Sequence, residues 1–538
     1  MRRHTLTDAA FAALAAGRPD AAAVDELRRA QLGRHLLMLR AIVEAAPEQA
    51  RQGYAALAAA EPAAVREVAS DPLVGLWAAS CLAALTRGEA PEEAGVERLA
   101  QLAAAAGAHG LAEQGCQPPD GAHGLAEQGC QRPGGAHGLA AQGGRRRLRA
   151  TRDGLTIDVR LEDTDPVRAR FGLTPAGRLT DRDVACWQEH LTEAWALLVD
   201  RHREAAVVLA SVLRVIVPVR PDPGVRGISA TSADAYGAVA ISAPATGTEL
   251  AVGLLHEAQH SVLNAVRYLF ELHTGPDALG YSPWRDDPRP PSGVLHGAYA
   301  YLAVTRFWRT EARAGGGPVA AFEFARWRAA VASAADELLA SDGLTAAGRR
   351  FVGALRDEVR PWLDEPVPPH AERLATTANT EHRARWRLRN LAVDPDAVRT
   401  LADAWRDGRP RPAADIPTRL VPAPGRALES SDRVRLAHEL LAGGAGGPEP
   451  VPGSDTPLVP GSHGTARDAY LKRDDAAWTG LAQISAQRAL RETPEIVAAV
   501  YRALGDPRVD PERLAAWLSR SWASVTSQRP RNRATQAP

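Results

Sequence analysis

The strongest chemical signal in the sequence is the segment His256-Glu257-Ala258-Gln259-His260, an H-E-x-x-H motif. Residues four apart lie on one face of a helix, so both imidazoles can reach the same metal ion. Neutral imidazole binds zinc, iron, nickel and copper, and the motif alone does not choose among them. The alternative is a pair of surface histidines on an amphipathic helix. We expect a metal site, because the motif falls inside a predicted helix that follows a predicted strand.

The elements around the motif are those that a metal-binding helix requires. Apolar residues recur with helical period over 249–272, which predicts a long helix that carries the motif. Two runs before it, 212–219 and 236–242, have the composition of buried strands. Thr246 and Thr248 are candidate N-cap residues of the helix. Strand, loop and helix therefore follow one another as in a zincin-like fold.

The third metal ligand is harder to identify from the residues. The metzincin continuation fails, because Leu263 and Val266 stand where that pattern needs Gly and His. His273 lies about 20 Å beyond His260 along the helix axis, too far to share an ion. His296 follows a proline-rich loop, near the start of a second predicted helix. Antiparallel packing of the two helices could bring His296 to the first pair.

Glu257 is the candidate catalytic residue, and it has two interpretations. In a zinc peptidase it would be the general base that deprotonates metal-bound water. In an oxygenase no such base is required, and Glu257 would orient a ligand, position water or steer the substrate. Tyr299 and Tyr301 follow His296 by three and five residues. Tyr299 could face the site, although a core position is the more common fate of such an aromatic residue.

Composition excludes several classes of protein. The 538 residues carry 64 Lys and Arg against 64 Asp and Glu, which excludes a protein that binds polyanions over its whole surface, and we expect no nucleic-acid partner. Four cysteines are too few for a disulfide scaffold in so long a chain. No segment near Met1 resembles a secretory signal, and no apolar stretch is long enough to span a bilayer. We therefore expect a cytoplasmic protein with no membrane partner.

Pattern and composition predict an α+β fold, mostly α-helical, with a zincin-like metal-binding helix and a small β-sheet flanked by helical regions. A 14-residue repeat, GAHGLAEQGCQPPD, begins at 107, recurs at 121 and is truncated from 135. Its His and Cys are seven residues apart, which is not the spacing of paired metal ligands, and its Gly and Pro favour a flexible insertion. The predicted regions are a helical N-terminal region (1–106), the repeat insertion (107–147), a catalytic domain (148–395), a helical, TPR-like region (396–526) and a disordered tail (527–538).

Four ordered blocks are spread along the chain and together span most of residues 4–420. They are the N-terminal segment 11–42, DAYGAVAIS before LLHEAQH, DDPRPPSGVLHGAYAY, and EHRARWRLRNL at 381–391. Together they resemble the HExxH-motif peptide-modification proteins of ribosomal-peptide gene clusters, which are iron- and 2-oxoglutarate-dependent peptide β-hydroxylases. The 14-residue repeats and a shortened C-terminal tail depart from the pattern of that family, which leaves the role of the tail open.

The resemblance implies Fe(II) held by His256, His260 and His296. Three protein ligands on one face of an octahedral ion leave two positions for 2-oxoglutarate and one for O₂. The implied reaction is β-hydroxylation of a residue in a ribosomally synthesised precursor peptide, with succinate and CO₂ as co-products. The implied partners are that peptide and a radical SAM peptide maturase.

The distal carboxylate of 2-oxoglutarate needs a cation, best a bidentate arginine. Arg289, seven residues before His296, is the first candidate, followed by Arg285 and Arg306. The alternative for Arg289 is an arginine that only structures the proline-rich turn.

Two other functions stay open on the sequence. One is a zinc metallopeptidase with Glu257 as general base, and the other is a non-catalytic adaptor whose helical tail binds a peptide or partner enzyme. A series with period two, Arg383, Arg385, Arg387 and Arg389, could bind an acidic leader peptide. A salt-bridged structural element explains the same series equally well.

Overall fold

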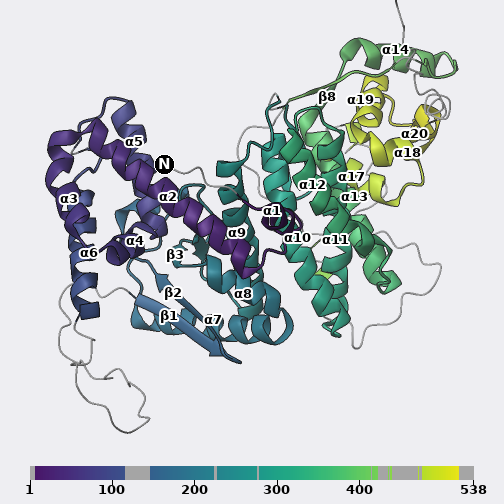
Figure 1. Ribbon diagram of the computed structural model, residues 1–538. Coiled ribbons are helices and arrows are strands. Elements are labelled where there is room, and N and C mark those ends of the chain that lie inside the picture. The colour runs from purple at the N-terminus through teal and green to yellow at the C-terminus, as the bar shows by residue number, and fades with distance from the viewer. Residues whose placement is uncertain are drawn as a thin grey trace, which may run out of the picture. The chain divides into compact units, whose positions relative to one another are not determined.

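The computed structural model describes residues 6–91, 93–114, 146–222, 227–275, 278–413, 415–421 and 475–519, together with 434, 437, 438, 441, 470 and 471. The fold is α+β and mostly helical, which confirms the predicted class (Figure 1). The chain divides into two compact units. The first consists of Met1–Leu272, Tyr299–Phe307 and Thr345–Asp357, and the second of His273–Ala298, Trp308–Leu344 and Glu358–Pro538.

Six helices open the first unit: α1 (Asp8–Ala15), α2 (Ala21–Ala45), α3 (Pro47–Ala59), α4 (Pro62–Ala69), α5 (Pro72–Thr86) and α6 (Arg98–Gln114). The side chains of Thr7, Asp20 and Asp71 accept hydrogen bonds from first-turn N–H groups and so cap α1, α2 and α5. Proline at the first helical position starts α3, α4 and α5, where its missing N–H costs nothing. Buried side chains such as Trp77 and Leu99 join the helices α2 to α6 in one core.

A five-stranded sheet follows, with the strand order β1-β2-β3-β5-β4. The strands are β1 (Arg146–Arg152), β2 (Leu155–Leu161), β3 (Val215–Val219), β4 (Ser229–Ala230) and β5 (Ala238–Ser242). β3 and β5 pair in parallel and are buried at every position, which explains their continuous apolar composition. β4 pairs antiparallel with β5 and forms one edge of the sheet.

Three helices of the first unit pack near this sheet: α7 (Asp181–Arg201), α8 (Arg203–Val212) and α9 (Gly247–Leu269). Thr246 is the N-cap of α9, because its hydroxyl accepts a hydrogen bond of 3.1 Å from the N–H of Glu249. Thr248 lies in the first turn instead. α9 contacts α2, α7, α8, β4 and β5, and most of its residues are buried. The helix that carries the motif is therefore held from several sides.

Two further helices contribute to the first unit, α10 (Pro291–Arg313) through Tyr299–Phe307 and α12 (Ala346–Val359) through its residues up to Asp357. Packed aromatic side chains join these two helices to α1. The ring centroid of Phe351 lies 6.0 Å from that of Phe11 and 5.2 Å from that of Tyr299. The Tyr299 hydroxyl donates a hydrogen bond to the carbonyl oxygen of Leu14 at the end of α1.

The second unit begins with a β-hairpin, β6 (Gly280–Ser282) and β7 (Arg285–Arg289), and continues with α11 (Gly317–Ala340), the short 3₁₀ helix η2 (Arg360–Asp364) and α13 (Pro369–Asn390). A second hairpin, β8 (Leu391–Val393) with β9 (Thr418–Leu420), flanks α14 (Pro395–Arg406). The last described helices are α17 (Asp475–Ile484), α18 (Arg488–Glu492), α19 (Pro494–Leu504) and α20 (Pro511–Ser519). They bury Trp478 and Tyr501 in a core shared with α14.

The predicted insertion and tail fall largely outside the described residues. α6 continues into the first repeat as far as Gln114, and β1 begins at Arg146, so residues 115–145 are the part of the insertion that is not described. The predicted tail, 527–538, also lies outside. Within the part of the chain that is described, no single helix is long and apolar enough to cross a membrane. The pair α4 and α5, bent by 74°, passes that criterion only when both helices are counted together.

Candidate metal centre

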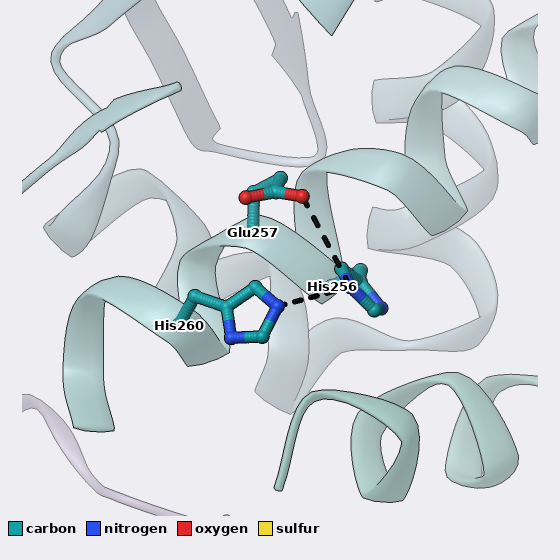
Figure 2. Close-up of side chains that lie close together, drawn as sticks. All are labelled: His256, Glu257 and His260. Atoms are coloured by element: carbon teal, nitrogen blue, oxygen red, sulfur yellow. Dashed lines mark hydrogen bonds and ion pairs between the residues drawn. The ribbon is translucent and has the colours of Figure 1, made fainter. Parts of the chain in front are cut away.

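The H-E-x-x-H motif lies in the middle of α9, and both histidines face the same side of the helix. The Nε2 atoms of His256 and His260 are 3.1 Å apart. Figure 2 shows the two imidazole rings turned towards each other, with the Glu257 carboxylate beside His256. Among the described residues, these three are the one group of His, Cys, Asp or Glu whose potential ligand atoms lie within 4.8 Å of one another. The structure thus brings together three of the residues that the sequence predicts for the site.

The donor set fits a metal ion. Two imidazole nitrogens at this separation can both face one ion at the usual metal–nitrogen distance of about 2.1 Å. Without an ion, one neutral ring can donate its N–H to the other. Imidazole, imidazole and carboxylate are ligands that both iron and zinc accept. The group therefore fits a divalent transition metal without choosing between the two.

The local electrostatics keep both imidazoles in the form that binds metal. Burial, and after it the neighbouring His260, lower the pKa of His256 to about 4, although the charge of Glu257 acts in the opposite direction. Burial also lowers the pKa of His260, again against the charge of Glu257. Both rings are therefore neutral at pH 7. Because only neutral imidazole is a ligand, no proton has to leave before a metal binds.

Glu257 is buried, with 2% of its surface exposed, and both of its carboxylate oxygens accept hydrogen bonds. The hydroxyl of Ser229 donates to Oε1 at 2.6 Å, and the hydroxyl of Thr231 donates to Oε2. Oε1 also lies 4.0 Å from Nε2 of His256. Ser229 belongs to the edge strand β4, and Thr231 follows it by two residues, so their side chains leave the chain on the same face.

Sequence reasoning missed two residues around the motif, Ser229 and Thr231, and of the two tyrosines it named, Tyr301 and not Tyr299 lies beside the motif. The centroid of the Tyr301 ring lies 5.1 Å from that of His256, and the ring planes meet at 84°. Tyr299 is instead a core residue, fully buried against α1 and α12. The hydroxyl residues at 229 and 231 have the period of a strand, which was the available signal, but they lie in a turn-rich segment.

His296 lies in the second turn of α10, in the stretch that belongs to the second unit. A side chain at the next residue, Gly297, would meet the indole of Trp284, since a Cβ there would lie 1.8 Å from the indole Nε1. Glycine therefore lets Trp284 pack directly against the helix beside His296. The role of His296 as third metal ligand stays a prediction.

Two of the three arginines predicted as cofactor anchors, Arg285 and Arg289, lie in the hairpin formed by β6 and β7. They flank Asp287 on one face of β7. Arg285 Nε donates to Asp287 at 2.8 Å, and Arg289 Nη1 donates at 3.3 Å. Burial opposes ionisation of Asp287, but the hydrogen bond and charge of Arg285, with those of Arg289, hold the pKa of Asp287 below its usual value. The cluster keeps one net positive charge. Arg289 is its more exposed cation, with 39% of its side chain accessible against 13% for Arg285.

Arg306, the third arginine candidate, binds backbone carbonyls at the end of α1. Its Nη1 donates to Gly17 at 2.8 Å, and its Nη2 donates to Ala16 at 3.0 Å. Gln259, inside the motif, donates to the same Gly17 carbonyl at 3.5 Å. A cation at a helix C-terminus also complements the helix dipole. These contacts favour a structural role for Arg306, and its role as a cofactor anchor stays a prediction.

The arginine series lies on the helix α13, not on a strand. Arg383 donates to Glu337 at 3.1 Å, Arg385 to Asp286 at 2.9 Å and Arg387 to Glu495 at 2.9 Å. Arg389 is exposed. Three of the four arginines thus form ion pairs inside the second unit, which favours the structural interpretation over peptide binding.

The group of His256, Glu257 and His260 on α9 is the structural feature that supports a functional proposal. Comparison of the whole chain with known proteins adds no assignment, because no protein-family model matches it and no curated protein matches it.

Proposed function

We propose that the chain is an Fe(II)- and 2-oxoglutarate-dependent oxygenase that hydroxylates a β-carbon in a ribosomally synthesised precursor peptide. The proposal joins the resemblance of the four sequence blocks to one structural observation. That observation is the pair of imidazoles of His256 and His260, with Nε2 atoms 3.1 Å apart, on a helix that contacts the sheet. His296 completes the proposed ligand set.

The proposed fold of the metal centre is zincin-like. It is supported by the parallel strands β3 and β5, the antiparallel edge strand β4, and the contacts of α9 with both β4 and β5. Tyr301, in the stretch of α10 that belongs to the first unit, contacts His256 on α9.

The chain's own residues have separate tasks in this proposal. Fe(II) with bound 2-oxoglutarate would supply the O₂-dependent oxidising chemistry, which the protein side chains lack. The histidines hold the metal, and Tyr301 restricts the orientation of the His256 ring. Arg289, the more exposed cation of its cluster, is the proposed anchor of the distal carboxylate of 2-oxoglutarate.

Both oxygens of the Glu257 carboxylate accept a hydrogen bond from a hydroxyl group, and each keeps a further lone pair. That arrangement suits a carboxylate held in one position. The precursor peptide and a radical SAM maturase stay the proposed partners, and the cytoplasm, where ribosomal peptides are made, is the proposed location.

The first experiment needs no peptide. We would load the protein anaerobically with Fe(II), add 2-oxoglutarate and record the visible spectrum. A weak charge-transfer band is expected, and the variant His296→Ala should lose it. Arg289→Ala should shift the 2-oxoglutarate titration to higher concentration. His190→Ala, which changes a half-buried histidine of α7, is the matched control and should keep the band.

Other outcomes would replace the proposal. Absence of the band, together with tight stoichiometric zinc in the purified protein, would favour the peptidase, and Glu257→Gln would be the next variant. Absence of stoichiometric metal, with peptide binding unchanged in His256→Ala and His260→Ala, would favour the adaptor.

A further inference from the structure

The buried Glu257 carboxylate has an unusual set of neighbours. A buried carboxylate is normally paired with Arg or Lys. Among the described residues, the one contact of Glu257 with a basic side chain is the 4.0 Å approach of its Oε1 to Nε2 of His256. Its hydrogen-bond donors are two uncharged hydroxyls, those of Ser229 and Thr231. Within the part of the chain that is described, no Arg or Lys therefore pairs with the Glu257 carboxylate beside the two imidazoles.

We propose that Ser229 and Thr231 are positioning residues of the metal centre, which hold Glu257 so that its charge faces the metal carried by His256 and His260. A divalent cation there would supply the positive charge that the surrounding side chains do not. The inference rests on the metal site of the proposed function, but not on the iron chemistry or on the peptide substrate.

The positions of both hydroxyls are fixed by the sheet. Ser229 lies opposite Ile241 in the antiparallel pairing of β4 with β5. Just before β4, the N–H of Ile228 donates to the Ser242 hydroxyl at 3.0 Å, and the N–H of Ser242 donates to the Ile228 carbonyl at 2.9 Å. β4 is thus tied to the last residue of β5.

The two hydroxyls act on Glu257 from one side. The hydroxyl oxygen of Thr231 also lies 3.5 Å from the backbone carbonyl oxygen of Glu257. Thr231 therefore contacts both the side chain and the main chain of this residue of α9. With Ser229 on one carboxylate oxygen and Thr231 on the other, rotation of the carboxylate would break at least one hydrogen bond. The edge strand therefore sets the direction of the charge next to the imidazole pair. Outer groups of this kind change metal affinity by about 10- to 100-fold in known metal sites.

The test measures metal binding, without turnover. Metal-free protein is titrated with Zn²⁺ or Co²⁺ against a chromophoric chelator, and the visible spectrum of the Co²⁺ form is recorded. We expect Ser229→Ala and Thr231→Val each to weaken binding about tenfold and to shift the Co²⁺ bands. Thr231→Ser keeps a hydroxyl and should restore affinity and spectrum. Ser232→Ala is the matched control, because the Ser232 hydroxyl binds the N–H of Asp234 and not Glu257.

A double-mutant cycle separates this role from general destabilisation. In a Glu257→Ala background, Ser229→Ala should cause no further loss of metal affinity, since the hydroxyl acts through the missing carboxylate. Equal losses in both backgrounds would overturn the inference, and so would an unchanged affinity and Co²⁺ spectrum in Ser229→Ala and Thr231→Val. If a Val or Ala variant fails to fold, Thr231→Ser and Glu257→Gln still provide the comparison. A wild-type protein that binds no divalent metal would instead overturn the metal site itself.

Discussion

Tyr301 and His256 meet edge to face, with 5.1 Å between ring centroids and 84° between ring planes. The contact joins α10 to the face of α9 that carries the candidate metal ligands, within the first unit. It restricts the rotation of the His256 ring and so reduces the entropy that a metal would otherwise have to remove on binding.

The first prediction concerns this contact. Tyr301→Ala should weaken Zn²⁺ or Co²⁺ binding about tenfold, because an outer group that orients a ligand is lost. Tyr301→Phe keeps the ring and should bind metal like the wild type. A chelator competition titration measures both. An equal loss in the two variants would assign the effect to the hydroxyl instead of the ring.

The second prediction concerns Arg306, whose two hydrogen bonds hold the carbonyls of Ala16 and Gly17. Arg306→Ala should lower the free energy of unfolding by about 2 kcal/mol, since hydrogen bonds to a charged group are lost. Thermal unfolding measures the change. The affinity for 2-oxoglutarate should stay the same, whereas Arg289→Ala should lower that affinity at unchanged stability. The reverse pattern would make Arg306 the cofactor anchor.

The elements that carry the site could be predicted because their signals are local. Apolar residues that recur about every 3.6 positions predicted α9, and the continuous apolar runs predicted β3 and β5. Thr246 was predicted as an N-cap candidate because its side chain can accept a hydrogen bond from the first turn. Two residues on one helix, Tyr299 and Tyr301, could not be distinguished in the same way. They differ by about 200° around the helix axis, and only tertiary packing decides which of them faces the metal ligands.

The hydrogen bonds that complete the site could not be predicted, because their partners are distant in sequence. Ser229 and Glu257 are 28 residues apart, and Gly17 and Arg306 are 289 apart. β4 has two residues, too few for a recognisable strand pattern. The arginine series left both possibilities open, since a period of two lines one face of a strand but spreads around a helix, and α13 shows that these side chains lie around a helix.

The third prediction concerns acid stability in the first unit. Asp165 accepts hydrogen bonds from Arg98, at 2.9 Å from its Nη1, and from the N–H of Val167 at 3.0 Å. Burial opposes ionisation of Asp165, but the hydrogen bonds and charge of Arg98 prevail and hold its pKa below the usual value. The stabilisation is therefore complete above the unfolded-state pKa of about 3.9 and is lost as the pH falls through the lower folded-state pKa.

Asp165→Asn should lower the free energy of unfolding by about 2 kcal/mol at pH 7. The difference from the wild type should shrink below about pH 4, where the wild-type carboxylate becomes protonated as well. Denaturant unfolding at several pH values measures this. Asp222→Asn, which changes an exposed carboxylate of the first unit, is the control. A difference that stays constant down to pH 3 would show that the charge of Asp165 does not contribute.

The last prediction separates structural from peptide-binding arginines on α13. Glu495 of α19 is 3% exposed and accepts two hydrogen bonds from Arg387. Arg387→Ala would leave this carboxylate buried without its cation, which typically costs about 3–5 kcal/mol. Arg389→Ala removes an exposed arginine two residues away and should change the stability by less than about 0.5 kcal/mol.

Chemical unfolding, followed by the tryptophan fluorescence of the second unit, distinguishes the two variants, since Trp478 lies in the core that α19 completes. Arg387→Gln, which keeps a hydrogen-bond donor but no charge, should fall between them. Two stable variants that both lose affinity for an acidic peptide would contradict this account and would return the arginine series to leader-peptide recognition. A large loss of stability in Arg387→Ala alone means that the series serves the fold: it ties α13 to α19, and substrate recognition has to be sought elsewhere.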